Sequence, residues 1–204
     1  MRYNEPASQI DMLRKVPSPK LVTVSLGGND TGFPSIIVNC ITIYAVKLLN
    51  QGQGPTCQQY YTNADGSNQV SNTIAGLRVP MFDALTDVRN AVSPDTTVVV
   101  MTYPAALSLA SGSCSLLDPM DMSWFTDLTH QLDQTVIAAA NAAGVQHLDE
   151  EYALQGHEMC TSQPWVQAPG LAQDPSVKNN YFHPLTPGYT QEAHDLKDDL
   201  WFFP

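Results

Sequence analysis

The chain has 204 residues, of which 43% are hydrophobic and only 14% charged, and its formal net charge at pH 7 is −11. This composition excludes a disordered chain and suits one domain with a real core, while the excess of acidic residues argues against nucleic acid and anionic membranes as partners. No apolar run reaches the length of a membrane span. The start, Met1–Pro6, lacks the apolar core of a signal peptide, which indicates that a leader was removed or that the chain begins within a longer protein.

Two short runs have the composition of buried strands, and a third short strand is predicted after them. Leu21–Leu26 is β-branched and mostly apolar, and Thr97–Tyr103 follows the same pattern, while Val145–Asp149 is the short third strand. Helices are predicted between and around these strands by apolar spacing, at 8–16, 30–50, 68–92, 123–143 and 186–201. The segments 51–66, 105–122 and 150–183 are predicted to be irregular. Alternating helices and buried strands are typical of an α/β parallel sheet, whose functional site lies beyond the carboxyl ends of the strands.

Three of the predicted helices contain residues that indicate a start, an end or a break. Pro80 is expected to disturb the long helix over 68–92, because proline lacks the N–H that the helix needs. Ser123 is the predicted N-cap of the next helix and Gly144 its C-cap. Pro187 suits the first turn of the closing helix.

Four cysteines are present, at positions 40, 57, 114 and 160, and none forms a C-x-x-C pair. Zinc binding and thioredoxin-like chemistry are therefore not expected. An even number near loop-like sequence predicts two disulfides and an oxidising compartment, although four buried thiols in a cytosolic protein remain the alternative. Of the three connectivities, pairing of neighbours in the sequence predicts Cys40–Cys57 and Cys114–Cys160.

Chemistry-bearing residues follow the first predicted strand. Gly27 and Gly28 allow a sharp turn and close backbone approach to a ligand, and Asn29 then offers a side-chain amide at the top of the sheet. Such an amide suits an oxyanion hole, because it stabilises developing negative charge without changing protonation. Asp30 is expected to cap the next helix or to hold the loop. An ordinary strand-to-helix turn explains the same residues equally well.

A second candidate segment opens the closing helix. His183 is followed by Pro184 and Pro187, which stiffen the turn and fix the imidazole. Histidine is the usual general base for a serine nucleophile. A single loop histidine is more often structural, so the prediction depends on the upstream Asn29 motif. His157-Glu158 lacks the second histidine of a zinc-enzyme motif, which leaves a metal-dependent enzyme little support.

Together, in this order, the two motifs resemble the SGNH (GDSL-type) serine esterases and lipases. The run from Ser25 to Phe33 (S-L-G-G-N-D-x-G-F) is similar to the family's third block, and Phe182 to Gly188 (F-H-P-x-x-x-G) is similar to its fifth. The stretch from Gly156 to Trp165 and the two expected disulfides resemble the extracellular branch found in actinobacteria and fungi. The resemblance covers essentially the whole chain.

The resemblance implies a flavodoxin-like three-layer α/β/α fold and hydrolysis of acyl esters without cofactor or metal. It assigns the general base to His183 and an oxyanion-hole donor to Asn29, with Gly28 and Asp30 at the substrate. The family often has aspartate three residues before the histidine, whereas this chain has Asn180. A Ser-His dyad branch uses a backbone carbonyl at that place, so the Asn180 carbonyl is the expected orienting group. The weaker alternatives are Asp174, Glu158 and Asp149.

The family's Gly-Asp-Ser block and the glycine of its second block do not occur in these residues, and neither does a Gly-x-Ser-x-Gly motif. Ser25, Ser113 and Ser162 lack an activating pattern. We therefore expect residues 1–204 to be a single, N-terminally incomplete domain of a secreted hydrolase of small or lipid esters. The alternative is an inactive, degenerate binding protein with the same fold.

The strand order that the resemblance implies predicts which strand lies at the edge of the sheet. In the order 2-1-3-4-5 the absent strands lie together, which leaves the strand at 21–26 at an edge of the sheet. Exposed apolar edges invite pairing with another chain. A homodimer, or the missing N-terminal segment, is therefore expected to cover this edge.

Overall fold

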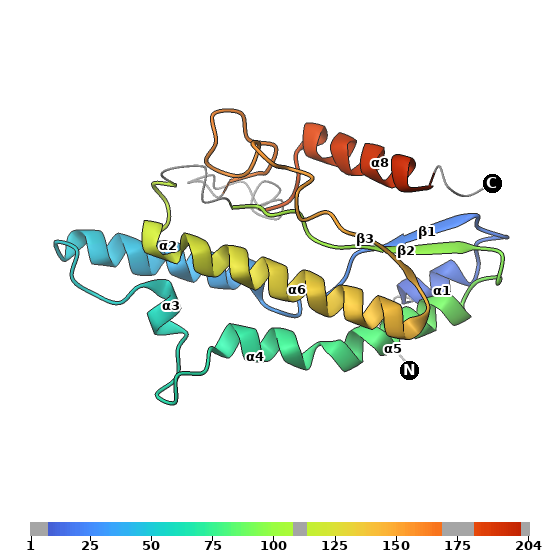
Figure 1. Ribbon diagram of the computed structural model, residues 1–204, viewed down its shortest axis with the longest axis horizontal. Helices are drawn as coiled ribbons and strands as arrows, with labels where there is room; N and C mark the ends of the chain where they lie inside the picture. The colour runs from blue at the N-terminus through green and yellow to red at the C-terminus, as the bar shows by residue number, and fades with distance from the viewer. Residues whose placement is uncertain (1–7, 108–113, 169–181, 201–204) are drawn as a thin grey trace, which may run out of the picture.

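The computed structural model describes residues 8–107, 114–168 and 182–200. Its strands are β1 (Leu21–Val24), β2 (Thr97–Met101) and β3 (Gln146–Leu148), which form one parallel sheet in the order β1-β2-β3 (Figure 1). Leu21 pairs with Thr97 and Val99 pairs with Gln146. The predicted parallel sheet is confirmed, and all three strands lie where the sequence placed them, although each is shorter than predicted.

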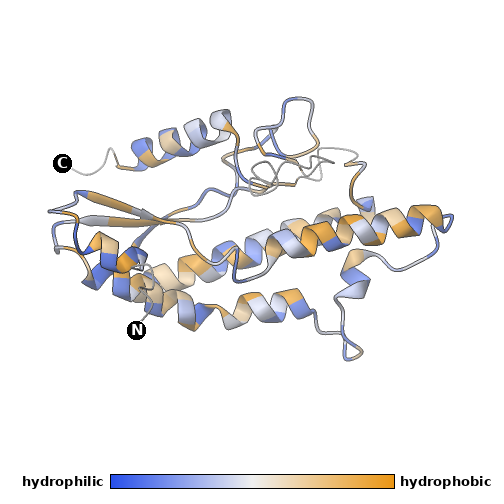
Figure 2. Ribbon diagram, turned by 180° about the vertical axis from the view of Figure 1, so that it is seen from behind, coloured by the Kyte–Doolittle hydropathy of each residue, from blue (hydrophilic) through white to orange (hydrophobic). Residues whose placement is uncertain are grey.

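Helices lie on both sides of this sheet. Helices α5 (Arg78–Asn90) and α6 (Met122–Ala143) pack against each other on one side, and α8 (Thr186–Leu200) lies on the other (Figures 1 and 2). The central strand β2 is covered on both faces, and Val98, Val99 and Val100 are all buried. The result is the three-layer α/β/α arrangement predicted from the sequence.

Strand β1 is an edge of the sheet in the described part of the chain. Its residues alternate between exposed and half-buried, and Leu21 is 38% exposed. This agrees with the edge position predicted from the strand order. The strand keeps apolar residues, although its outer side has no neighbouring strand among the described residues.

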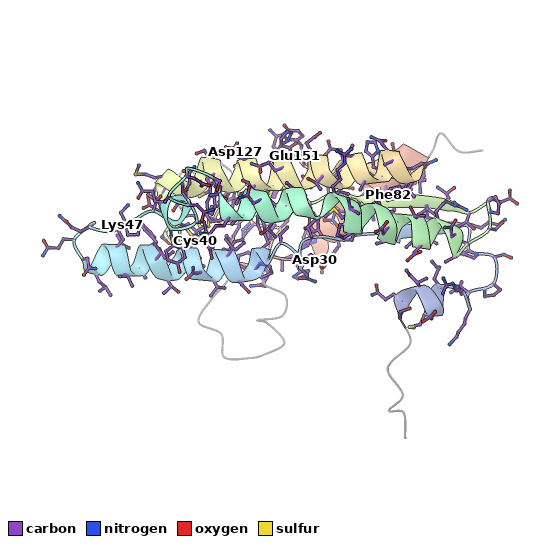
Figure 3. The ribbon with its side chains drawn as sticks, turned by 90° about the horizontal axis from the view of Figure 1, so that it is seen from below. Asp30, Cys40, Lys47, Phe82, Asp127 and Glu151 are labelled. Carbon is purple, nitrogen blue, oxygen red and sulfur yellow. A yellow bond between two sulfur atoms is a disulfide. The ribbon has the colours of Figure 1, made fainter. Side chains whose placement is uncertain are left out.

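Helix α2 (Phe33–Leu49) follows β1 and leads away from the sheet. It begins near Asp30 and carries Lys47 near its far end (Figure 3). The Lys47 ammonium lies 2.7 Å from a carboxylate oxygen of Asp118, and both side chains are largely buried. A short 3₁₀ helix, η2 (Pro119–Asp121), follows Asp118 and leads into α6. This ion pair therefore ties the end of α2 to the start of α6.

The predicted helix over 68–92 is two helices, α4 (Gln69–Gly76) and α5, separated at Leu77. Pro80 accounts for the break, because it cannot donate to the carbonyl of Gly76 and its ring crowds that carbonyl. Pro80 instead lies in the first turn of α5, where a missing N–H costs nothing. Pro80 therefore disturbs the predicted helix as expected, but the break lies at Leu77, about one turn before the proline.

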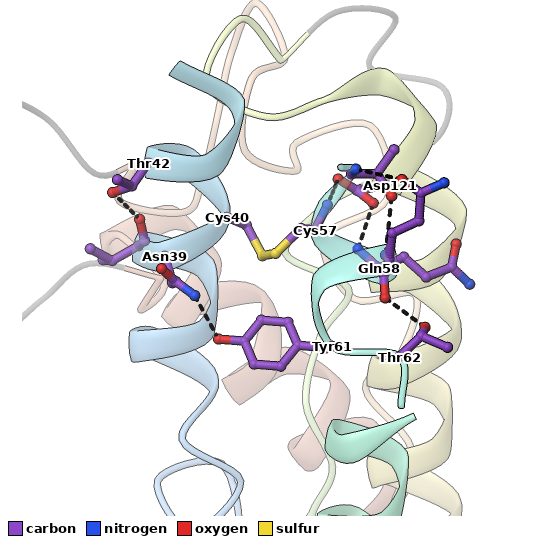
Figure 4. The surroundings of a disulfide bond; sticks show 11 residues. Asn39, Cys40, Thr42, Cys57, Gln58, Tyr61, Thr62 and Asp121 are labelled. Atoms are coloured by element: carbon purple, nitrogen blue, oxygen red, sulfur yellow. Dashed lines mark hydrogen bonds between the residues drawn. A yellow bond between two sulfur atoms is a disulfide. The ribbon is translucent and has the colours of Figure 1, made fainter. Parts of the chain in front are cut away.

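The predicted cap at Ser123 is wrong, because α6 begins at Met122 and Asp121 occupies the N-cap position. The Asp121 carboxylate accepts the backbone N–H groups of Cys57 and Gln58, at 2.8 and 2.9 Å (Figure 4). Gly144 does end α6, with a φ of 66°.

A short helix lies inside the segment 51–66 that was predicted to be irregular. Helix α3 (Cys57–Tyr60) begins with a capping box, in which Thr56 and Gln59 each satisfy a backbone N–H of the other. The spacing T-x-x-Q was the sequence signal for this helix. The predicted helix over 8–16 is the shorter α1 (Gln9–Leu13), which is capped by Ser8.

Both predicted disulfides are confirmed. Cys40 of α2 is bonded to Cys57 of α3 (Figure 4). Cys114 is bonded to Cys160, and the α-carbons are 5.1 Å apart in each pair. The first bond fixes α3 against α2. The second ties the segment before α6 to the long loop after β3.

We expect removal of the Cys114–Cys160 bond by the double change to serine to lower the free energy of unfolding by about 4 kcal/mol, and removal of Cys40–Cys57 by about 3 kcal/mol. The order follows from sequence separations of 46 and 17 residues, because a longer closed loop restricts the unfolded chain more. Urea unfolding of the two double variants measures both values. A larger loss for the 40–57 pair would contradict the chain-entropy explanation.

Candidate functional site

The turn after β1 depends on its two glycines. Gly27 has a φ of 103°, which side chains rarely adopt, and a β-carbon there would collide with the Met81 methyl group. A β-carbon on Gly28 would lie 3.0 Å from the ring of Tyr103. The N–H of Thr31 donates to the Gly27 carbonyl at 3.0 Å and closes the turn. The turn therefore presents Asn29 and Asp30, both exposed, at the carboxyl end of β1.

Tyr103 links this turn to the rest of the sheet. Its hydroxyl oxygen accepts the backbone N–H of Gly28 at 2.9 Å, and its own backbone N–H donates to the Asp133 carboxylate, also at 2.9 Å. Tyr103 follows β2, and Asp133 lies on α6. The position of the turn is thus fixed across three elements. The sequence pattern gave no signal for this role of Tyr103.

The segment that carries His183 is fastened to a neighbouring loop. The backbone carbonyl of His183 accepts the N–H of Gln167 at 2.9 Å, and Phe182 donates its N–H to the Gln167 carbonyl at 2.8 Å. One residue further along, Pro184 forms a β-bridge with Val166. Gly188, at the start of α8, packs so closely against this loop that a β-carbon would lie 2.9 Å from the Trp165 carbonyl oxygen. Main-chain contacts therefore position the histidine.

The stretch from Gly156 to Trp165 supports that loop. The His157 ring stacks on the Trp165 ring, with centroids 3.7 Å apart, and the Trp165 N–H donates to the His157 carbonyl at 2.8 Å. The Glu158 carboxylate accepts the N–H of Gly156 at 2.9 Å. His157 and Glu158 thus have structural contacts. In the described part of the chain, no three His, Cys, Asp or Glu side chains gather as a metal site.

One cavity of about 440 Å³ opens at the carboxyl ends of β1 and β2, and both Asn29 and His183 line it. These two residues come from opposite ends of the described chain, and the fold brings them to the same cavity, as the order of the motifs predicted. Gly28 also lines the cavity, whereas Asp30 is not among the lining residues. Asn180 and Asp174 lie outside the described residues. The catalytic roles assigned to these residues stay predictions.

Ser25 is the serine among the described lining residues of this cavity. It is exposed and follows the last residue of β1. Ser162 is exposed in the loop after β3 and is not among the lining residues, and Ser113 lies outside the described residues. Ser25 is therefore the serine whose reactivity has to be tested.

The cavity also has acidic surroundings that the sequence analysis missed. Glu192 of α8 lines the cavity, and burial, reinforced by nearby Asp195, raises its pKa to about 7. Glu150, just after β3, is 1% exposed, and neither of its carboxylate oxygens has a hydrogen-bond partner. Burial, together with Asp195, Glu192 and Asp149, raises the pKa of Glu150 to about 8. The sequence analysis assigned no role to the acids of α8, because sequence spacing does not show which face of a helix a sheet covers.

Asp133 is a third acid with a raised pKa. It is 1% exposed, and one of its oxygens has no partner. Burial raises its pKa to about 8, although the hydrogen bond from the Tyr103 N–H acts in the opposite direction. An unfolded chain would release this proton near pH 4, whereas the folded chain keeps it up to about pH 8. Unfolding therefore releases a proton between these pH values, and stability falls as pH rises by about 1.4 kcal/mol per unit for each such group.

We expect Asp133→Asn to stabilise the fold at pH 8 by about 1–3 kcal/mol and to have little effect at pH 4.5. The amide keeps the oxygen that accepts the Tyr103 N–H, but it carries no charge that burial must oppose. Urea unfolding at both pH values checks this result, and Asp198→Asn, an exposed change on α8, serves as the control. Destabilisation of Asp133→Asn at pH 8 would show that the carboxylate is ionised and paired.

Sequence comparison finds two curated relatives, and no protein-family model matches. Lipase 1 of Streptomyces coelicolor is 26% identical over 148 residues, which are 72% of this chain and 49% of the relative. A lipase of Streptomyces rimosus is 25% identical over 187 residues, which are 89% of this chain and 62% of the relative. The chain thus spans between about half and two thirds of the length of these relatives.

Comparison with solved structures also finds Streptomyces enzymes. The structure of phospholipase A1 from Streptomyces albidoflavus matches with a TM-score of 0.70 and 22% identity, over 94% of this chain and 76% of that one. The extracellular lipase of Streptomyces rimosus matches with a TM-score of 0.61 and 24% identity, over 88% and 68%. These likenesses confirm the predicted fold class. None of the helices in the described part of the chain is long and apolar enough to cross a membrane.

Proposed function

We propose that this chain, a distant homologue of the SGNH-type extracellular lipases of Streptomyces, supplies the general base and one oxyanion-hole donor of a carboxylic-ester hydrolase. The observation that supports the proposal most is the shared cavity of Asn29 and His183 at the carboxyl ends of the strands. His183 is the base and the Asn29 amide is the donor. The serine nucleophile comes from a segment outside these 204 residues.

In the proposed reaction each group has a defined role. The serine oxygen attacks the ester carbonyl carbon while His183 takes the hydroxyl proton, and the carbonyl oxygen becomes an oxyanion. The Asn29 amide donates a hydrogen bond to that oxyanion, which lowers the barrier because the donor is already held in place. His183 then gives its proton to the departing alkoxide. Water, activated by the same imidazole, releases the acid from the acyl-enzyme.

The local structure suits these roles. The Gly28 N–H is already donated to Tyr103, so in this proposal Gly28 contributes by its close packing against the Tyr103 ring, which holds the Asn29 turn in place. The proposal also assigns the orientation of the imidazole to the backbone carbonyl of Asn180, which lies outside the described residues. The Asn29 turn and the His183 loop are both held by main-chain hydrogen bonds, which supports a preorganised site.

We further propose that the protein is secreted and acts on small or lipid esters. The two disulfides and the extracellular relative support the location. We propose that the edge of β1 is covered either by the segment that carries the nucleophile or by a second copy of the chain. An uncovered apolar edge promotes association.

The second candidate function is that of an inactive binding protein with the same fold. The absence of a Gly-Asp-Ser motif from these 204 residues favours it. In that case the cavity would bind its ligand without turning it over, and His183 would have no serine proton to accept.

A chimera separates the two functions. The segment of the Streptomyces rimosus lipase that carries the family's Gly-Asp-Ser block is joined to the start of this chain, and hydrolysis of p-nitrophenyl butyrate is measured. We expect turnover by the chimera, and no turnover by the chain alone beyond that of its His183→Ala variant. Alanine at the donated serine is the matched control. A folded chimera that does not hydrolyse the ester would support the binding protein instead.

A further inference from the structure

The wall of the Asn29–His183 cavity includes a carboxyl group that bears a negative charge when it is ionised. Glu192 is the acidic residue among its described lining residues, and no lysine or arginine is among them. Asp195 lies close enough to Glu192 to raise its pKa. The electrostatic field in the cavity therefore favours a cation over an anion.

Buried Glu150 is not among the described lining residues of the cavity, but it belongs to the same group of acids as Glu192. It is 1% exposed, its two carboxylate oxygens have no hydrogen-bond partner, and the acids that influence it most are Asp195 and Glu192. Its backbone is held in place, because the Glu150 N–H donates to the Thr102 hydroxyl at 2.8 Å. A buried carboxyl group without a partner is costly. A cation beside Glu192 would offset the repulsion within this group of acids.

The other walls suit an organic cation. Four aromatic side chains line the cavity, namely Phe33, Tyr103, Phe182 and Tyr189. Tyr189 and Glu192 are three residues apart on α8 and therefore share a helix face. Aromatic faces attract cations, most strongly where water is excluded, and aromatic walls with a carboxylate suit a quaternary ammonium group. A divalent metal would need several oxygen ligands, and the described residues offer no such cluster.

We propose that this cavity binds a compact organic cation of the trimethylammonium type through Glu192 and the aromatic wall, and that the cation belongs to the alcohol part of the ester. The assignment to the alcohol part rests on the proposed ester hydrolase, whereas cation binding itself does not. Glu192 thus determines specificity by favouring esters of cationic alcohols over esters of neutral ones.

Binding of the cation is coupled to protons. A cation stabilises the ionised form of Glu192, so affinity rises as pH increases through about 7. The other titratable groups around the cavity and its acids are His183, Tyr103, Tyr189, Asp149, Glu150 and Asp195. Ionised Asp149, Glu150 and Asp195 strengthen binding.

Calorimetric titration with choline chloride tests the proposal on the chain itself, with 3,3-dimethylbutan-1-ol as the neutral molecule of the same shape. We expect choline to bind at least about tenfold more tightly than the neutral alcohol, and about tenfold more tightly at pH 8 than at pH 6. Glu192→Gln is expected to lose most of this preference. Asp198→Asn, which removes one exposed charge from the same helix, is expected to change the affinity less than about twofold.

Three results would overturn the proposal. They are equal binding of choline and the neutral alcohol, equal weakening by the two variants, and no choline binding by the folded chain. Circular dichroism confirms folding of each variant, and the amide of Glu192→Gln matches the protonated carboxyl in shape. The titration needs no turnover. An inactive chimera that binds choline would therefore refute the proposed hydrolase but support the cation site. An active chimera that does not bind choline would refute the cation site but support the hydrolase.

Discussion

Replacement of His183 by alanine in the chimera is expected to lower kcat for p-nitrophenyl butyrate by about 10²–10⁴-fold, with little change in KM. The imidazole would be the group that takes the serine proton, and no other histidine is among the described residues that line the cavity. Some residual turnover is expected, because the oxyanion hole and substrate binding act without the base.

The matched control for this prediction is His194→Ala. His194 lies in α8, the helix that follows His183. It is exposed and is not among the described lining residues of the Asn29–His183 cavity. We expect this variant to keep the turnover of the parent chimera. Equal losses in the two variants would indicate damage to α8, and full activity of His183→Ala would refute the assignment of the base.

Replacement of Asn29 by alanine is expected to lower kcat by about 10²–10³-fold, again with little change in KM. The amide would bind the oxyanion, which exists only during the reaction, and the uncharged ester would lose little binding when the amide is removed. Steady-state kinetics over a range of ester concentrations separate the two parameters.

Asn72→Ala is the control for Asn29, because Asn72 is an exposed asparagine on α4, far from the turn after β1 in the chain. It is expected to change kcat less than about twofold. A rise in KM with unchanged kcat in Asn29→Ala would assign Asn29 to ground-state binding. That result would contradict the oxyanion role.

The sheet was predictable because its strands have distinctive composition. Val98, Val99 and Val100 are consecutive and apolar, and burial on both faces by helices explains why the pattern does not alternate. The break near Pro80 was predictable in cause but not in position. Helix α3 was missed because four residues are too few for a periodic pattern, although its capping box was present in the sequence.

Only part of the candidate cavity could be read from the sequence. Asn29 and His183 were found because each lies in a motif at the end of an element. Tyr103 and Glu192 were missed, since their importance comes from contacts between distant segments that no local pattern records. Asp133 was missed for the same reason. Its burial inside the sheet–helix interface depends on the packing of α6.

We propose that this chain provides the base and the oxyanion donor but not the nucleophile. A fluorophosphonate reacts covalently with activated serines, and peptide mapping by mass spectrometry then locates the modified residue in the chimera and in the chain alone. We expect the fluorophosphonate to label the donated serine of the chimera, no label on that serine in the His183→Ala chimera, and no labelled peptide from the chain alone. Label on Ser25, or on any other serine within residues 1–204, would contradict it.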